Sequence, residues 1–290
     1  MTAVPQAAQD HYRAMQRLQV LALRAARRSW TRVDGRYLSQ SWTPVVAREL
    51  APVIAGIQVS AAASGASYGA ATLAEQGAWV APEAFVDPRA FGGYAADGRS
   101  LDGLLYSPIT SVKSWIADGH SASEALAMGR GVLDTIARTI VADAGRQAAG
   151  IDTASRKGVG YVRMLNPPSC SRCVVLAGRF YRWNAGFRRH PRCDCVHIQS
   201  AAGSTQAALD EGLISDPYEY FRGLPKGEQD KIFGEHEAAA IRDGGDIFQV
   251  INSKRGRQGA FTTEGTGRHG NAGSALRPGQ RRMTPETIYR

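Results

Sequence analysis

The spacing of apolar residues predicts that the first half of the chain is mostly helical. Over residues 7–33, apolar side chains recur every three or four positions, and arginines cover much of the remaining surface. This is the pattern of a helix with one buried face. The residues that mark the buried face are Tyr12, Met15, Leu18 and Ala22.

A second helix is predicted to begin at Thr43, which suits an N-cap, with Pro44 at the first helical position. Its apolar stripe is Val46, Leu50, Val53 and Ile57, and Pro52 is expected to kink it. Residues 61–74 continue it with almost nothing but small side chains. They predict either a surface that another helix can approach closely or a weak, frayed helix.

Residues 83–102 are rich in Pro, Gly and Asp and are expected to form a loop. A short helix should then run from Ser107 to about Gly119. Ser121 and Glu124 have the spacing of a capping box, which predicts a long helix after them. One face of this helix carries Leu126, Leu133, Ile136, Ile140 and Ala144.

The period of the pattern changes near Gly158. Residues 159–165, 179–183 and 193–198 are strand-like, and two or three short helices are expected between Thr205 and Val250. After Asn252 the chain has little to bury, and residues 253–290 hold eight Lys or Arg against two Glu, a net charge of +6. We expect this tail to be flexible.

These elements predict an α+β fold in three regions. Residues 1–155 form a helical body. Residues 156–252 form a small zinc-stabilised β-ribbon with short helices, and residues 253–290 form the flexible basic tail.

Charge and composition narrow the possible environments. The chain of 290 residues has a formal net charge of +9 and a pI near 9.6, which favours a polyanionic neighbour such as nucleic acid. No run of about 18 apolar residues is present, so we expect no membrane-spanning segment. The N-terminal residues do not resemble a secretory signal, which predicts a reducing, cytosolic compartment where clustered cysteines more often bind metal.

All four cysteines and two of the six histidines fall within residues 170–197. Cys170 and Cys173 form a pair, and after sixteen residues the sequence His190-x2-Cys193-x-Cys195-x-His197 follows. Thiol and imidazole pairs at this spacing are typical of tetrahedral zinc. A full set of such ligands predicts a structural zinc ion, because catalytic zinc keeps a position open for water.

The favoured ligand set is Cys170, Cys173, His190 and Cys193. Cys195 could replace His190 or Cys193, because alternate residues of a strand point to the same side. His197 is expected at the surface or behind the ligands. Two disulfides are the alternative to zinc.

Arginines crowd around this cluster, with only Asp194 to oppose them between residues 160 and 198, and Tyr181, Trp183 and Phe187 lie among them. The pattern suits phosphate contact with aromatic stacking, or equally a solvated surface with packed aromatics. The residues predicted to contact nucleic acid or a partner are Arg179, Arg182, Arg188, Arg189, Arg192, Lys254, Arg255 and Arg257.

Catalytic signatures are not evident. His236-Glu237 begins like a zinc-protease motif, but Ala240 stands where the second histidine should be. We therefore assign no catalytic residue, and we expect His11, His120 and His269 to be surface residues.

The residues CSRCVVLAG…HPRCDC resemble the Mu-F-like minor head proteins of tailed phages, the phage head morphogenesis family. Matching positions are Cys170, Cys173, Gly178, His190, Pro191, Cys193 and Cys195. The flanking GYVRMLNPPSCSRC, IRDGGDIFQVINSKRG and terminal RRMTPETIYR are similar to versions from phages of actinobacteria. The resemblance covers roughly residues 100–290 and is most specific at 159–198.

That resemblance implies a virion protein inside the head, held in several copies near the portal after assembly in the host cytoplasm. Its implied partners are the portal protein, the major capsid or scaffold protein, and the double-stranded DNA genome without sequence preference. The alternatives are a capsid maturation protease, a zinc-dependent nucleic-acid-processing enzyme, or a free nucleic-acid-binding regulator.

Overall fold

The computed structural model describes residues 4–165, 169–186, 195–214 and 216–253. The chain divides into two compact units. The bundle unit contains residues 4–161 and also residues 182–201. The C-terminal unit contains residues 162–181 and the chain that follows residue 201. The division expected after residue 155 therefore lies after residue 161, and a second segment returns to the bundle unit.

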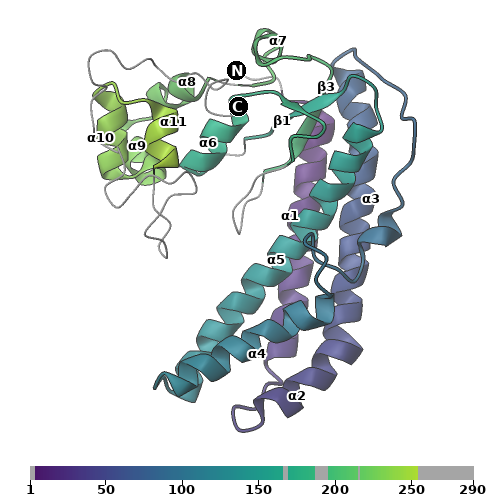
Figure 1. Cartoon of the computed structure of the whole chain (residues 1–290), viewed down its shortest axis with the longest axis vertical. Coiled ribbons are helices and arrows are strands. Elements are labelled where there is room, and N and C mark those ends of the chain that lie inside the picture. The colour runs from purple at the N-terminus through teal and green to yellow at the C-terminus, as the bar shows by residue number, and fades with distance from the viewer. Residues whose placement is uncertain (1–3, 166–168, 187–194, 215, 254–290) are drawn as a thin grey trace. The chain divides into compact units, whose positions relative to one another are not determined.

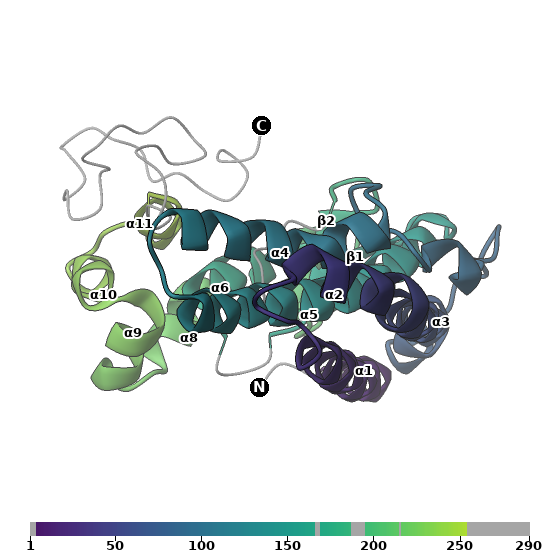
Figure 2. The same cartoon turned by 90° about the horizontal axis from the view of Figure 1, so that it is seen from below.

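Three long helices run side by side through the bundle unit (Figure 1). They are α1 (Gln6–Trp30), α3 (Ala51–Glu75) and α5 (Ala122–Ala154). Two further helices, α2 (Leu38–Val45) and α4 (Leu101–Ala117), gather at one end, as Figure 2 shows from below. The helix predicted over residues 7–33 is confirmed as α1.

The end of the bundle that α2 and α4 occupy holds its bulkiest apolar core. The rings of Trp30 and Trp42 meet edge to face with their centroids 5.1 Å apart. The Trp42 indole is fully buried, and its Nε1 donates to the Leu105 carbonyl oxygen at 3.0 Å. Leu105, Ile109 and Leu133 complete this part of the core. Burial of the two indoles thus joins α1, α2 and α4.

Midway along the bundle, α3 and α5 lie unusually close. A Cβ placed on Gly65 would lie 2.2 Å from the Gly145 carbonyl oxygen, so only glycine fits there. A Cβ on Gly145 would meet the Met15 side chain of α1. The small residues 61–74 therefore allow a close helix approach, as the sequence predicted, and the frayed-helix alternative is wrong.

The Thr43-Pro44 pair predicted that the second helix begins at Thr43, and this prediction is wrong. It begins at Leu38, with Pro44 inside α2, because Trp42 and Val45 must face the core. A π-helical turn, η1 (Val46–Leu50), joins α2 to α3, where Pro52 lies in the first turn. Pro52 was expected to kink this helix. The departure from regular α-helix that the structure has is the π turn, which ends directly before α3.

The connection from α3 to α5 is partly as predicted. The loop contains a short 3-10 helix, η2 (Pro88–Phe91). The helix α4 starts at Leu101 rather than Ser107, because the Ser100 side chain caps it by accepting a hydrogen bond from the Gly103 N–H. The capping box of Ser121 and Glu124 is confirmed at the start of α5. Leu133, Ile140 and Ala144 are buried along its predicted face.

By length and composition alone, the stretch Leu38–Glu75 is long and apolar enough to cross a membrane. Core helices of water-soluble proteins often pass the same test. In this structure 44% of its most apolar window is buried, and α3 packs along α1 and α5.

The strands are β1 (Gly160–Arg163), β2 (Tyr181–Arg182) and β3 (His197–Ser200), in a sheet of order β2-β1-β3. The α+β class is confirmed. The third strand begins at His197, so residues 195 and 196 of the predicted range 193–198 are not strand, while residues 193 and 194 lie outside the described residues. It belongs to the bundle unit, where the Tyr68 hydroxyl donates to the His197 carbonyl oxygen at 3.0 Å.

The C-terminal unit consists of short helices around a separate apolar core. They are α6 (Ser171–Ala177), α7 (Thr205–Asp210), α8 (Pro217–Arg222), α9 (Lys226–Phe233), α10 (Glu235–Arg242) and α11 (Ile247–Asn252). Val174, Phe221, Phe233 and Ile247 lie in this core. Five helices follow Thr205 in the described residues, where two or three were predicted. The predicted tail of 254–290 lies outside the described residues.

Candidate metal centre

The first predicted ligand pair lies at the start of α6. Cys170 is the N-cap residue, with extended backbone angles, and Cys173 is the third residue of the first turn. The pair therefore stands where a helix starts. Residues three apart share one side of a helix, so this start brings both thiols together.

The Sγ atoms of Cys170 and Cys173 lie 3.4 Å apart. Two thiolates on one tetrahedral zinc, each about 2.3 Å from it, lie about 3.8 Å from each other. A disulfide needs an S–S distance of about 2.05 Å. The pair therefore has the separation of two ligands of one ion to within a few tenths of an ångström, and the described cysteines form no disulfide.

The surroundings of the pair also suit a bound cation with thiolate ligands. Cys170 is exposed, whereas Cys173 is 4% exposed and packs into the C-terminal unit. One buried and one accessible sulfur would leave an entry path for the metal.

The remaining predicted ligands are not all described. His190 and Cys193 lie outside the described residues. Cys195 is buried in the bundle unit, where its carbonyl oxygen accepts from Arg146 Nε at 2.9 Å. Within the described part of the chain, no group of three or more His, Cys, Asp or Glu could hold a metal. The structure thus describes one thiol pair, and the complete ligand set stays a prediction.

Two of the clustered arginines stack on an aromatic ring. The guanidinium carbon of Arg179 lies 4.8 Å from the Tyr181 ring centroid, and that of Arg163 lies 5.4 Å from it. Arg163 is buried and Arg179 is half-buried, so both contribute to packing. Arg182 is exposed beside the exposed Trp183. Arg188, Arg189, Arg192, Lys254, Arg255 and Arg257 lie outside the described residues.

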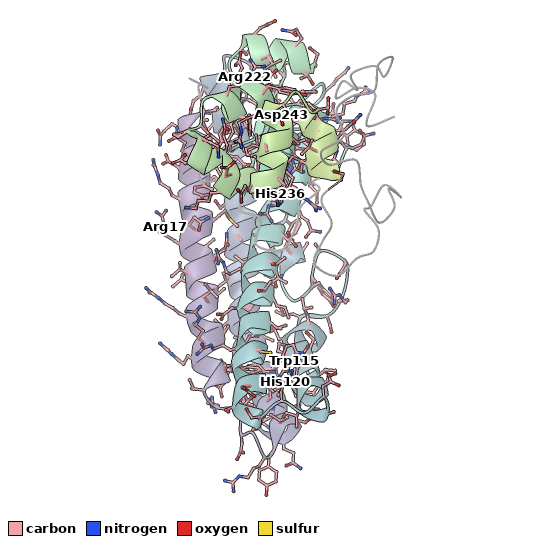
Figure 3. The ribbon with its side chains drawn as sticks, turned by 90° about the vertical axis from the view of Figure 1, so that its left-hand side faces the viewer. Arg17, Trp115, His120, Arg222, His236 and Asp243 are labelled. Atoms are coloured by element: carbon pink, nitrogen blue, oxygen red, sulfur yellow. The ribbon has the colours of Figure 1, made fainter. Side chains whose placement is uncertain are left out.

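His11 was expected at the surface and is buried, so that prediction is wrong. His197 is also buried, which contradicts the surface alternative and leaves a place behind the ligands as a prediction. His197 is 2% exposed and packs against the Tyr161 ring, with centroids 4.4 Å apart. His11 is 4% exposed and stacks on Tyr68. His120 is exposed near one end of the bundle, as predicted (Figure 3). His269 lies outside the described residues.

The His11 site is a polar contact inside the bundle. Its ring lies parallel to that of Tyr68, 3.9 Å away, and its Nδ1 is 2.8 Å from Ser64 Oγ. Burial, and secondarily the positive charge of Arg146, lower the pKa of His11 to about 4. The imidazole is therefore neutral at pH 7.

Two buried ion pairs, one within α5 and one between α5 and Arg156 just after it, were not anticipated from the sequence. Arg146 Nη1 lies 3.1 Å from Asp143 Oδ1, and Arg156 Nη2 lies 2.9 Å from Asp152 Oδ1. All four side chains are almost fully buried. Opposite charges three or four residues apart within a run of small residues are the signal that could have revealed them.

A pocket of about 650 Å³ lies in the bundle unit, along one face of α5. Asp143, Arg146, Tyr161 and His197 contribute its charged and titratable groups, and Trp183 lies among its apolar lining. The described lining residues include no serine, threonine or cysteine. Asp143 and His197 are lining groups of a kind that can activate water.

No protein-family model, curated protein or solved structure matches this chain. The functional argument therefore depends on the chain's own residues and on the motif around the cysteines.

Proposed function

We propose that this chain is a minor head protein of a tailed phage, associated with the portal inside the head and stabilised by one structural zinc ion. The observation that carries the proposal is the thiol pair of Cys170 and Cys173 within the motif CSRCVVLAG…HPRCDC.

Zinc would have an architectural role at this place. The pair lies where α6 begins, and Val174 and Val175 of the same helix lie in the core of the C-terminal unit. An ion that holds both thiols would fix the start of α6. It would thereby hold Val174 and Val175 in place in the core of the C-terminal unit. His190 and Cys193, or Cys195 in place of one of them, would complete four ligands.

Non-specific contact with the DNA genome is the second part of the proposal. Arg182 and Trp183 are exposed next to each other, which suits a phosphate contact beside an aromatic surface. The predicted tail adds eight Lys or Arg against two Glu after Asn252. Such a distribution favours binding that depends on salt and not on sequence.

The metal part is tested by measuring zinc in the purified full-length chain by mass spectrometry. We expect one zinc per chain, and Cys170→Ser and Cys173→Ser should each lower that content strongly. Arg172→Gln is the matched control, because Arg172 is exposed and lies between the two cysteines. Zinc content that is absent from the wild type, or unchanged in both cysteine variants, would contradict this assignment.

The assembly part is tested by co-expression with the portal protein of the same phage. We expect the chain to co-purify with portal rings and to be incorporated into heads, and Cys170→Ser to reduce both. Failure to bind the portal, with normal zinc content, would reject the assembly role while leaving the metal site in place.

The runner-up is an enzyme, a maturation protease or a nuclease, and the pocket on α5 is where we would test it. Cleavage of capsid protein or DNA by the purified chain, abolished by Asp143→Asn or His197→Gln at unchanged zinc content, would overturn the non-enzymatic proposal. We expect no such cleavage.

A further inference from the structure

One face of α1 carries a symmetric pattern of arginines around two apolar residues. The arginine face consists of Arg13, Arg17, Val20, Leu21, Arg24 and Arg28. At 3.6 residues per turn, these six positions fall within about 100° of one another around the helix axis. All six residues are exposed, and Figure 3 shows Arg17 pointing away from the bundle.

The arginines of this face are mostly not engaged by the protein itself. Arg13 pairs with Asp10 of the same helix, at 2.9 Å. Within the described residues, no carboxylate lies in salt-bridge distance of Arg17, Arg24 or Arg28, whereas nearby Arg27 and Arg32 have Asp134 and Glu49. The bundle thus neutralises Arg27 and Arg32, which lie outside the face, and leaves Arg17, Arg24 and Arg28 of the face without a carboxylate partner among the described residues.

The middle of the face is apolar. Val20 is 43% exposed and Leu21 is 48% exposed, so each presents a substantial aliphatic surface to solvent. An aliphatic patch of this kind gains nothing from a phosphate backbone, whereas it can pack against the apolar seam of a helix. Apolar residues at the centre with charges around them are also the usual arrangement of a protein interface.

We propose that the arginine face of α1 binds an acidic amphipathic helix of a partner protein. The face extends over sixteen residues, or about 22 Å from the first Cα to the last, which matches a partner helix of about four turns. Aspartates or glutamates at both ends of that helix would pair with the arginines, and its central apolar residues would cover Val20 and Leu21. This inference concerns α1 and does not depend on the proposed zinc site or on the phage assignment.

The face is also nearly the same when read in either direction, since Arg13 and Arg28, like Arg17 and Arg24, lie at equal sequence distances from the Val20-Leu21 centre. Two copies of this chain packed through it would bring arginine against arginine. Like charges across an interface are unfavourable, so the occupant must be acidic and cannot be a second α1.

The test uses the full-length chain and a synthetic helical peptide. The peptide repeats the spacing of the face, with glutamate opposite each arginine and leucine at the two central positions. A peptide of the same composition in scrambled order keeps the net charge but no longer places its leucines opposite Val20 and Leu21. A short DNA duplex is the third probe, and binding is measured by fluorescence anisotropy at several salt concentrations.

We expect the patterned peptide to bind at least about tenfold more tightly than the scrambled one. The double variant Val20→Ser/Leu21→Ser and the double variant Arg17→Gln/Arg24→Gln should each weaken it about tenfold. The matched controls are Val53→Ser, an exposed valine of α3, and Arg48→Gln/Arg89→Gln, two exposed arginines elsewhere. Both should bind the patterned peptide like wild type.

Two results would overturn the proposal. Equal binding of the patterned and scrambled peptides would show that the face binds acidic peptides through net charge alone. DNA binding that falls in Arg17→Gln/Arg24→Gln but not in Val20→Ser/Leu21→Ser, without selective peptide binding, would make the face a nucleic-acid surface instead.

Discussion

Gly65 of α3 and Gly145 of α5 lie so close that a Cβ on Gly65 would meet the Gly145 carbonyl oxygen at 2.2 Å. The two backbones touch without a side chain between them. We predict that Gly65→Ala lowers the free energy of unfolding by roughly 1–3 kcal/mol, because the helices must move apart. Urea unfolding followed by circular dichroism measures this.

Gly56 of the same helix provides the control, since a Cβ there would meet nothing within 4 Å. Gly56→Ala should raise the free energy of unfolding by up to about 1 kcal/mol, because alanine costs less backbone entropy in a helix. Equal effects of the two substitutions would show that helix propensity, and not the close approach, governs position 65.

The buried His11 makes stability depend on pH. Its pKa in the folded protein is about 4, below the unfolded value of about 6.5. Unfolding therefore takes up a proton between these values, and stability should fall as the pH drops from 6.5 toward 4. The full effect is about 3 kcal/mol, measured as urea midpoints between pH 7 and pH 4.5.

His11→Phe should remove this acid slope while keeping a ring against Tyr68. His120→Gln, at an exposed position, should leave the slope as in wild type. If the slope persists in His11→Phe, another group must take up the proton.

Chelation should destabilise the C-terminal unit selectively. With the thiol pair at the start of α6, we predict that removal of zinc loosens α6 and the helices packed on it, α8 and α11. Hydrogen exchange should then accelerate in these helices and stay slow in the middle of α5. Uniform acceleration across both units would instead indicate that the metal supports the whole chain.

Removal of the tail after Asn252 should weaken DNA binding and flatten its salt dependence. For each phosphate that the tail no longer neutralises, the slope of log K against log salt becomes shallower by about 0.9. The measurement is DNA affinity at several salt concentrations for the full and shortened chains. Identical slopes would show that the tail does not bind DNA.

The long helices could be predicted from the sequence because their signals are local. The capping box at Ser121 and the apolar spacing of α1 depend only on neighbouring residues. The start of α2 could not be predicted in this way. The Thr43-Pro44 signal is overridden by burial of Trp42 against α4, a contact between residues 63 positions apart.

The burial of His11 could not be predicted for the same reason. Nothing near His11 in the sequence indicates burial, because its partners Ser64 and Tyr68 come from another helix. For the candidate metal site, the Cys170 and Cys173 pair could be predicted because both residues lie in one turn. Its completion involves His190 and Cys193, on which the described residues give no information.

The return of residues 182–201 to the bundle unit means that, from residue 4 onward, the polypeptide passes from one unit to the other at three places. Neither unit is a continuous stretch of sequence, so no single cut yields either one intact. A gene fragment ending at Tyr161 would lack β3 and its hydrogen bonds to Tyr68 and Gln76. Ribosomal synthesis must therefore pass residue 201 before the bundle can be complete, which ties its folding to that of the cysteine-bearing segment.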